Sequence, residues 1–368
     1  MNGSASRQSH ESGVTLGGMF LSSSDAESRH DAQVIVVGAG LSGLIAAQTL
    51  TEAGVRCLLL DKGRSAGGRL ATRRFVVQGS SGFPSRVTAR ADHGAQFFTV
   101  RSPDFAELVH QWRRAGIVRE WCQGFTAGGD GHPRYCAEAG MNTIAKFLAA
   151  SADIETGVTV TRVLDAADGS FVVEAGDRRR WTAPVVLLSA PVAQSLELLS
   201  AGGIVLDADV DAALRAISYA RCLALIVVLD GASAVPEPGA VQLDVSEDPL
   251  FSFVADNHRK GISETVTLTL HTHDEPSLAM WDQDRDTTCQ RLLAQAQRWI
   301  GSANVTDSQL HGWRYARPVQ GHPDPCLITS TPSGGLMGFI GDAFGGAKVE
   351  GAALSGLAAA QQLLGVQG

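Results

Sequence analysis

The sequence is poor in cysteine and has no arrangement of cysteines that would suit a disulfide framework or a zinc site. Its 368 residues contain six cysteines, none of them in a C-x-x-C pair. Dispersed cysteines are typical of a reducing compartment, so we expect a cytoplasmic protein without structural disulfides or a bound metal. Most of the six are expected to be small core residues: they are Cys57, Cys122, Cys136, Cys222, Cys289 and Cys326.

Long apolar runs and runs of basic residues are also missing. A membrane-spanning helix needs about 20 apolar residues, and the longest apolar run, around residues 222–229, has the length of a strand. The formal net charge is −8, and basic residues gather only in short clusters such as Arg178–Arg180. With 44% hydrophobic residues, the chain is predicted to be a soluble globular protein of one large or two ordinary domains, without a membrane or nucleic-acid partner.

The first 31 residues lack periodicity and are rich in Ser and Gly. They have neither the basic start and apolar core of a secretory signal nor the acid-free composition of a transit peptide. We expect a disordered extension in residues 1–31, and the sequence leaves open whether Met1 or Met19 is the true start.

Residues 32–63 carry a pattern typical of dinucleotide binding. A short β-branched run, Val34–Val37, predicts a buried parallel strand, and three glycines in G-x-G-x-x-G order follow it. A helix to Ala53 and a strand over 55–60 come next, and Asp61 ends that strand where a carboxylate can bind a ribose hydroxyl. The expected cofactor contacts are Gly38, Gly40, Leu41, Ser42, Gly43, Asp61 and Lys62.

Each glycine of this pattern has its own expected role. The first allows a tight turn, the second lets the backbone approach a pyrophosphate at the helix N-terminus, and the third lets helix and strand lie close together. The alternatives are a purely structural glycine turn and a capping role for Asp61. The complete order of strand, glycines, helix, strand and acid favours dinucleotide binding.

Two further segments decide between NAD and FAD by resemblance. "GRSAGGRLATRR" (63–74) and "GLMGFIGDAFGGAKVEGAALSGLAAAQQLL" (335–364) resemble the two flavin motifs of the glutathione-reductase-like FAD proteins of the amine oxidase superfamily. The resemblance implies non-covalent FAD, with one guanidinium at the diphosphate and a helix N-terminus facing the pyrimidine edge of the flavin. The cofactor residues it implies are Gly67, Gly68, Arg69, Leu70, Gly341, Asp342, Val349, Glu350, Gly351 and Ala352. The alternatives are an exposed basic loop and a plain glycine-rich helix start.

The fold expected from these motifs is α/β, a Rossmann-like FAD-binding domain with a discontinuous α+β substrate domain. Residues 153–199 alternate in polarity, turn at Asp168–Gly169 and end in a strand, Val185–Ser189. By resemblance they form the β-meander and returning strand of the FAD domain, which places Val160, Ala190 and Pro191 at the cofactor. We expect the FAD domain in 32–100, 151–195 and 315–368, and the substrate domain in 101–150 and 196–314, with strands at 221–229 and 265–271 and a helix over 284–300.

Within the superfamily, four segments resemble the renalases and their bacterial relatives. They are "ADHGAQFFTVRSPDF" (91–105), "FSFVADNHRKG" (251–261), "LTLHTHDEP" (268–276) and "HGWRYARP" (311–318). Renalases are FAD oxidases that return 2- or 6-dihydro isomers of NAD(P)H to NAD(P)+ and pass the electrons to dioxygen, giving hydrogen peroxide. The resemblance therefore implies a dihydronicotinamide dinucleotide and dioxygen as the small-molecule partners.

The substrate residues are expected from the same motifs. The counterpart of "DHGAQ" passes close to the flavin ring, so His93, Gly94 and Ala95 are placed there, and Gln96 could hold a carboxamide. Asn257 and Trp313 should line the pocket, although Trp313 could instead fill the core. Lys348 could put a cation where amine oxidases have an aromatic wall, or it could be a solvent-facing residue at a helix start.

Two other functions stay open at the sequence level. One is an FAD enzyme of the same fold with another donor, such as an amine oxidase or a desaturase, and the other is a non-catalytic flavin-binding redox sensor. The sequence leaves open the preferred hydride isomer, the choice between NAD and NADP, and the oligomeric state, a dimer included.

Overall fold

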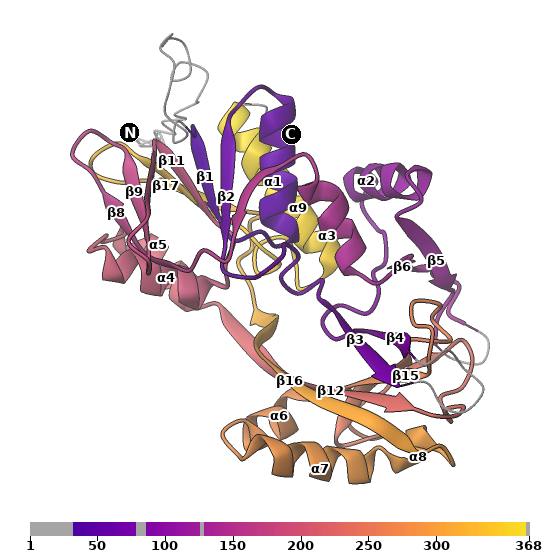
Figure 1. Cartoon of the computed structure of the whole chain (residues 1–368). Coiled ribbons are helices and arrows are strands. Elements are labelled where there is room, and N and C mark those ends of the chain that lie inside the picture. Colours follow the sequence, from indigo (N-terminus) through magenta and orange to yellow (C-terminus); the bar gives the residue numbers. More distant parts are fainter. Residues whose placement is uncertain (1–31, 79–85, 126–128, 366–368) are drawn as a thin grey trace, which may run out of the picture.

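The computed structural model describes residues 32–78, 86–125 and 129–365. The expectations for residues 1–31, including the choice between Met1 and Met19, lie outside these residues. Figure 1 shows two parts, a sheet covered by helices and a second, lower sheet with helices beneath it. Among the described residues, no helix combines the length and apolar character needed to cross a membrane.

The upper part is built on a six-stranded sheet in the order β17-β18-β11-β1-β2-β7. Its central strands are uninterrupted apolar runs because both faces of the sheet are covered. Five strands are parallel, and β17 pairs with β18 in the antiparallel direction at one edge. The strands are β1 (Val34–Val37), β2 (Cys57–Asp61), β7 (Asp153–Thr156), β11 (Val185–Leu188), β17 (Leu327–Ser330) and β18 (Leu336–Phe339).

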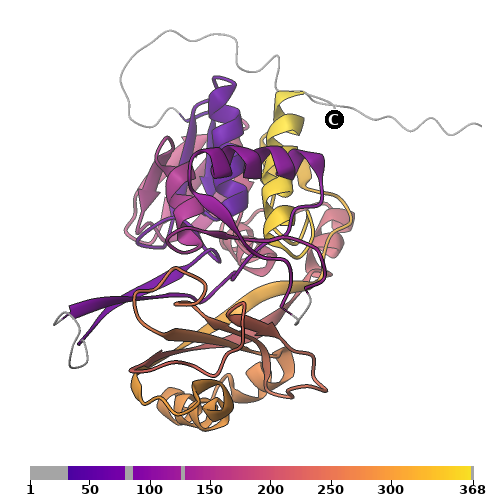
Figure 2. The ribbon, with the colours of Figure 1, turned by 90° about the vertical axis from the view of Figure 1, so that its right-hand side faces the viewer.

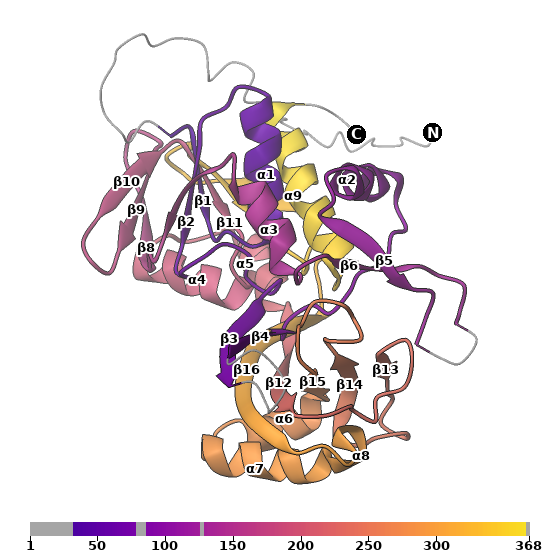
Figure 3. The same cartoon turned by 45° about the vertical axis from the view of Figure 1, so that its right-hand side comes forward.

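Helices cover one face of this sheet. They are α1 (Leu41–Glu52), α2 (Pro103–Arg114), α3 (Asn142–Ala149) and α9 (Val349–Leu364). The first and last helices lie side by side (Figures 1 and 3). Glycine makes this approach possible, since a Cβ added at Gly356 would lie 2.2 Å from the carbonyl oxygen of Ser42. The first and last helices of the described chain thus share one core.

The other face carries the expected meander, β8 (Val160–Asp165), β9 (Phe171–Ala175) and β10 (Arg180–Ala183), with α4 (Val192–Ala201) and α5 (Ala208–Arg215). The predicted turn at Asp168–Gly169 joins β8 to β9, and Gly169 has a φ of +81°. The predicted returning strand is β11, so this part of the expected fold is confirmed.

The segment 101–150 packs with the upper part. Phe105, Trp112 and Ile144 of α2 and α3 share a buried core with α1 and α9. The short pair β5 (Val118–Cys122) and β6 (Arg134–Ala137) joins the same core. The expected domain limits remain a prediction, and this packing favours assigning 101–150 to the upper part.

The lower part is a five-stranded antiparallel sheet in the order β13-β14-β15-β12-β16. The strands are β12 (Ser218–Leu229), β13 (Ala240–Gln242), β14 (Phe251–Asp256), β15 (Thr267–Thr272) and β16 (Val305–Gln320). Figure 3 shows α6 (Asp274–Met280), α7 (Arg285–Gln295) and α8 (Gln297–Ile300) beneath it. The expectation of one helix over 284–300 was wrong, because the turn tightens at Ala296, whose N–H bonds the carbonyls of both Leu292 and Leu293.

Two features join the parts. The long strands β12 and β16 run from the lower sheet up to the first (Figure 1). The hairpin of β3 (Thr72–Gln78) and β4 (Arg86–Asp92) extends away from the body in Figure 2. Its base lies beside β15, so Asp92, at the end of β4, stands at the junction of the two parts.

Candidate active site

A cavity of ≈ 1520 Å³ lies between the two parts. Its wall includes Gly38, Asp61, Ser189 and Gly341, which stand at or just beyond the carboxyl ends of β1, β2, β11 and β18, respectively. This edge of a parallel sheet is where open α/β folds bind their ligands. The volume exceeds the roughly 300–1,000 Å³ of an ordinary ligand pocket, which leaves space for a second molecule beside a dinucleotide.

The first glycine loop has the geometry that its sequence predicts. Gly38 has a φ of +107°, and the Ser189 hydroxyl donates to its carbonyl oxygen at 2.7 Å. A Cβ at Gly43 would lie 2.3 Å from the Gly38 carbonyl oxygen, so Gly43 serves close packing. Gly40 differs from both, because a Cβ there would meet no protein atom within 4 Å although the residue lines the cavity. Its bare backbone is therefore open to a ligand.

Asp61 caps the glycine loop and also lines the cavity. Its Oδ2 accepts a hydrogen bond from the Ala39 N–H at 2.6 Å, and its Oδ1 accepts one from the Gly63 N–H at 2.7 Å. An ionised carboxylate has about four acceptor positions, so two remain for hydroxyl groups of a ligand. The capping and ribose-binding roles left open by the sequence are compatible.

Arg69 and Asp342 join the two expected flavin motifs. The guanidinium donates two hydrogen bonds to the carboxylate, at 2.6 and 2.7 Å. Burial raises the pKa of Asp342, and the neighbouring Arg69 opposes that rise. The resemblance placed the guanidinium of Arg69 at a diphosphate, and in the structure this guanidinium is paired with Asp342. No local signal predicts the pairing.

The second glycine loop leads into α9. Gly341 has a φ of +144°, and a Cβ there would again meet no protein atom within 4 Å. Gly351 serves packing, because its added Cβ would lie 2.1 Å from the Gly346 carbonyl oxygen. The Glu350 carboxylate lines the cavity and accepts from the backbone N–H groups of Arg101 and Ser102, at 3.1 and 2.6 Å. It thereby ties the segment before α2 to the first turn of α9.

Most of the residues expected at the cofactor line this cavity. The exceptions are Gly43, His93 and Gly351, which stand behind the wall. Those on the wall are Gly38, Gly40, Leu41, Ser42, Asp61, Lys62, Gly67, Gly68, Arg69, Leu70, Gly94, Ala95, Val160, Ala190, Pro191, Gly341, Asp342, Val349, Glu350 and Ala352. The bare glycine backbones at 40 and 341 fit the diphosphate-containing cofactor, since α1 begins directly after Gly40 and the first turn of α9 lines the same cavity.

Histidine and tryptophan side chains gather where the lower sheet meets the cavity. The carbonyl oxygen of His93 accepts from Trp313 Nε1 at 2.6 Å and contacts His271 Nε2 at 3.1 Å. The rings of His93 and His311 lie 4.8 Å apart. Burial lowers the pKa of His93 to about 3 and that of His271 to about 4, so both are neutral at pH 7. Trp313, His271 and His311 line the cavity.

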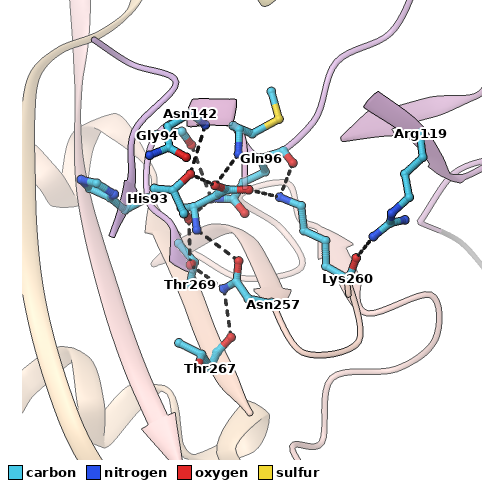
Figure 4. Close-up of polar contacts among 12 residues, drawn as sticks. His93, Gly94, Gln96, Arg119, Asn142, Asn257, Lys260, Thr267 and Thr269 are labelled. Carbon is cyan, nitrogen blue, oxygen red and sulfur yellow. Dashed lines mark hydrogen bonds and ion pairs between the residues drawn. The ribbon is translucent and has the colours of Figure 1, made fainter. Parts of the chain in front are cut away.

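Two expected substrate residues lie outside the cavity wall. Gln96 donates from Nε2 to the carbonyl oxygens of Asp92 and Gly94. Asn257 is fully buried and donates to the Thr267 carbonyl oxygen at 2.9 Å and the Thr269 hydroxyl at 3.0 Å. Figure 4 shows both in a polar network behind the wall. The expectation that Gln96 holds a carboxamide and that Asn257 lines the pocket does not fit this placement.

Several basic side chains also stand on the wall. Arg101, Arg314, Arg317 and Lys348 line the cavity, and among the described residues none has a carboxylate within ion-pair distance. Three of the carboxylates on the wall have other partners. Asp342 pairs with Arg69, Asp130 pairs with Arg134, and an oxygen of Asp274 accepts from the Arg221 N–H at 2.7 Å. Lys348 is both exposed at the helix start and part of the wall, so its two expected roles are compatible.

Known families account for both halves of this architecture. Residues 36–112 match the profile of the NAD(P)-binding Rossmann-like domain. Residues 119–364, more than half of the chain, match that of the flavin-containing amine oxidoreductases. The chain belongs to the flavin-containing amine oxidoreductase family. It is therefore an FAD-dependent oxidoreductase with a Rossmann-like cofactor domain, as the sequence predicted.

Solved structures share the fold of this amine oxidoreductase at low identity. A provisionally named protoporphyrinogen oxidase from Exiguobacterium sp. 255-15 superposes with a TM-score of 0.65 at 10% identity, over 92% of this chain and 99% of its own. A fatty acid isomerase from P. acnes that produces CLA gives 0.61 at 14%, over 89% and 98%. An oxidoreductase from Methanosarcina mazei gives 0.57 at 16%, over 89% and 99%.

One curated sequence relative carries an activity in its name. A provisionally named L-amino-acid oxidase, YobN, of Bacillus subtilis strain 168 is 47% identical over 47 residues. The match spans 13% of this chain and 10% of that protein.

Proposed function

We propose that this oxidoreductase oxidises 2- or 6-dihydro isomers of NAD(P)H to NAD(P)+ and reduces dioxygen to hydrogen peroxide. When bound, FAD supplies the acceptor for the hydride at N5 and the route of the two electrons to dioxygen. The dihydropyridine loses a hydride and becomes aromatic, and dioxygen takes up two electrons and two protons. The balance is one isomer, one dioxygen and one proton giving one NAD(P)+ and one hydrogen peroxide.

The observation that carries the proposal is the basic cavity wall. Arg101, Arg314, Arg317 and Lys348 have no ion-pair partner among the described residues, so they offer charge-assisted hydrogen bonds to the pyrophosphate of a dinucleotide. The same charges disfavour a protonated amine, because like charges repel strongly in a partly desolvated site.

The histidines agree with a hydride donor. Hydride loss from a dihydropyridine leaves no proton for a base to remove, so the site needs positioning more than acid–base chemistry. His271 and His311 present neutral, polar edges to the cavity, and burial is the main cause of the lowered pKa of each. Trp313 also lines the cavity, with its ring 4.5 Å from that of His311, and can stack on a planar ring.

A second candidate function is oxidation of an L-amino acid. The identity with YobN favours it, and an α-carboxylate would suit the same cations. Amino acid oxidation requires the loss of an amine proton, which oxidation of a dihydropyridine does not. An amino acid is also a smaller donor, so it would leave much of the cavity empty. A redox sensor without turnover would keep its flavin oxidised with every donor.

Product stoichiometry tests the proposal. We would incubate the purified FAD protein in air with each dihydro isomer, with ordinary NAD(P)H and with a panel of L-amino acids and amines, and measure NAD(P)+, hydrogen peroxide and ammonia. The expected result is one NAD(P)+ and one hydrogen peroxide per 2- or 6-isomer, with little product from the other donors. Ammonia and peroxide from an amino acid alone would transfer the assignment to the second candidate.

A further inference from the structure

Lys260 is a buried cation that none of the expected site roles uses. Its side chain and that of Asp92 both have 0% exposure, and Nζ lies 2.6 Å from Asp92 Oδ2. Nζ also donates to the Gln96 carbonyl oxygen and lies 5.1 Å from the centre of the Trp121 ring. Burying an ion pair costs more desolvation free energy than a surface pair, so it needs this full set of partners. Figure 4 shows Lys260 reaching into the network from the turn after β14.

Lys260 holds both ends of one short stretch. The Lys260 ammonium group binds both ends of the segment Asp92–Gln96, namely the Asp92 carboxylate and the Gln96 carbonyl oxygen. Between them, Gly94 and Ala95 line the cavity. The lysine therefore fixes a piece of the cavity wall from behind without touching the cavity itself.

Backbone hydrogen bonds of the same segment hold it on the side of the upper sheet. The N–H of His93 donates to the Ala71 carbonyl oxygen at 3.1 Å, and that of Ala95 donates to the Arg69 carbonyl oxygen at 2.8 Å. A Cβ at Gly94 would lie 2.0 Å from the Arg69 carbonyl oxygen, so there is no slack at this contact. A displacement of the segment would move Arg69, which pairs with Asp342 across the cofactor wall.

Asp92 connects the segment to four other stretches of the chain by hydrogen bonds. Its Oδ1 accepts from the Thr72 hydroxyl at 2.5 Å and from the Met141 N–H at 2.8 Å. Its own N–H donates to Asn257 Oδ1 at 3.2 Å, and its carbonyl oxygen accepts from the Thr269 hydroxyl at 2.9 Å. Without Lys260 the Asp92 carboxylate would be a buried charge with no counterion. Both parts of the molecule would still need Asp92 as a hydrogen-bond partner.

Apart from Asp92, side chains of the segment do little to anchor it to other parts of the chain, since Gln96 Nε2 donates only to carbonyl oxygens inside the segment. His93 Nδ1 and Gln96 Oε1 are buried atoms without a hydrogen-bond partner. The position of the segment thus depends on its backbone contacts and on the Asp92–Lys260 pair. We propose that Lys260 is a positioning residue: it locks the Asp92–Gln96 segment, and with it the wall at Gly94–Ala95, in the place where bound flavin and its hydride donor meet.

The part of this inference that concerns catalysis rests on the proposed function, and the part that concerns the wall does not. The test therefore uses two donor-independent readouts, amide hydrogen exchange of residues 93–98 and the visible spectrum of bound FAD. A third readout is the limiting rate of flavin reduction by whichever dihydro isomer reduces the wild type. If no isomer reduces the wild type, the proposed function fails while the first two readouts still decide the role of Lys260.

The central variant is Lys260→Met, which keeps the length of the side chain and removes the charge. We expect FAD to remain bound, the amides of His93 and Ala95 to exchange about tenfold faster or more, and the flavin spectrum to change. The limiting reduction rate should fall by up to about 100-fold, as for an ångström-scale misplacement, while the Kd of the donor changes little. Wild-type exchange and a wild-type spectrum in the folded variant would overturn the inference.

A second variant covers the case in which Lys260→Met does not fold. The double variant Asp92→Asn/Lys260→Met has no buried charge, so its folding does not depend on the ion pair. We expect it to fold and to show the same faster exchange at His93 and Ala95. Wild-type protection of these amides in the double variant would contradict the inference.

Two controls separate positioning from general destabilisation. Arg298→Met removes the ion pair between Arg298 and Asp248. This pair also belongs to the lower part, but neither residue lines the cavity. Leu292→Ala cuts into the core beneath the lower sheet. Both should leave the flavin spectrum and the exchange of residues 93–98 unchanged. If Leu292→Ala reproduced the Lys260→Met spectrum, the effect would be one of stability and the inference would be wrong.

Discussion

Arg69 and Asp342, 273 residues apart, form a two-pronged ion pair at 2.6 and 2.7 Å. Each belongs to a different glycine motif, and each lines the cavity. The ion pair thus joins two motifs that lie towards opposite ends of the described chain, and both motifs contribute to the cofactor site. FAD binding should therefore depend on both Arg69 and Asp342.

Arg69→Met should weaken FAD binding without unfolding the protein. It leaves the carboxylate of Asp342 largely buried without a counterion, which costs free energy and raises its pKa further. We expect the Kd of FAD, measured by fluorescence quenching of added FAD, to rise about tenfold or more, equivalent to ~1.4 kcal/mol. Arg162→Met, which breaks the ion pair with Glu174 on the meander, is the matched control. Equal FAD affinity in both variants would exclude a role for the pair.

Gly40→Ala and Gly43→Ala should have opposite consequences. The added Cβ at position 40 meets no protein atom, so stability of the apoprotein should stay within ~0.5 kcal/mol while FAD binding is lost or much weakened. The Cβ at position 43 would lie 2.3 Å from the Gly38 carbonyl oxygen, so the fold itself should be destabilised. Urea unfolding of the apoproteins and flavin content after purification separate the two effects. A yellow Gly40→Ala protein with full FAD would argue against a close backbone approach at this residue.

Stability should fall on the acid side because of the buried histidines. The pKa of His93 is lowered to about 3 and that of His271 to about 4, below the value of 6.5 for an unperturbed histidine. Between pH 6.5 and these values the unfolded state binds protons that the folded state does not, so this stability is complete above pH 6.5 and declines as the pH falls towards 4. The slope is at most about 1.4 kcal/mol per pH unit for each histidine.

The acid effect can be assigned with one variant and one control. His271→Gln keeps a donor that can reach the His93 carbonyl oxygen and removes one titrating group, so it should flatten the decline in the free energy of unfolding between pH 6.5 and 5. The exposed His110→Gln should leave the decline unchanged. The assignment fails if both variants lose stability with the same slope as the wild type.

The basic wall predicts a specific pattern of donor affinity. Arg314→Gln and Lys348→Gln should each raise the Kd of a dinucleotide donor about tenfold, since a hydrogen bond to a charged group contributes ~1.5–3 kcal/mol. The limiting rate of flavin reduction should change little, because the proposal assigns these residues to the phosphates and not to the reacting ring. Arg215→Gln on α5, which is paired with Asp211 at the surface, is the control. Unchanged donor affinity in both cavity variants would remove the support for a pyrophosphate-bearing donor.

The secondary structure around the cofactor could be predicted because its signals are local. The apolar run of β1, the glycine spacing and the helix that follows all lie within about 20 residues of sequence. The strand at 185–188 and the start of α9 were likewise readable from short runs. The resemblance to known flavin proteins added the second glycine loop as a cofactor contact.

The polar network behind the wall could not be predicted. Lys260 stands beside His258 and Arg259 in a sequence that suggests an exposed turn, and its partner Asp92 is 168 residues away. Gln96 and Asn257 were expected to meet the substrate, but both stand behind the cavity wall. The side-chain direction of each depends on how β4 and β14 meet β15. Such contacts arise only when distant segments assemble.

The central claim is that the cavity accepts a dihydropyridine dinucleotide as hydride donor. The most direct measurement is anaerobic stopped-flow mixing of the oxidised protein with the 2-, 6- and 4-dihydro forms of NAD(P)H and with L-amino acids, following loss of the flavin absorbance. The account predicts rapid bleaching by the 2- or 6-isomer and slow or no bleaching by the others. Bleaching by an amino acid alone, with every dihydro isomer inert, would contradict it.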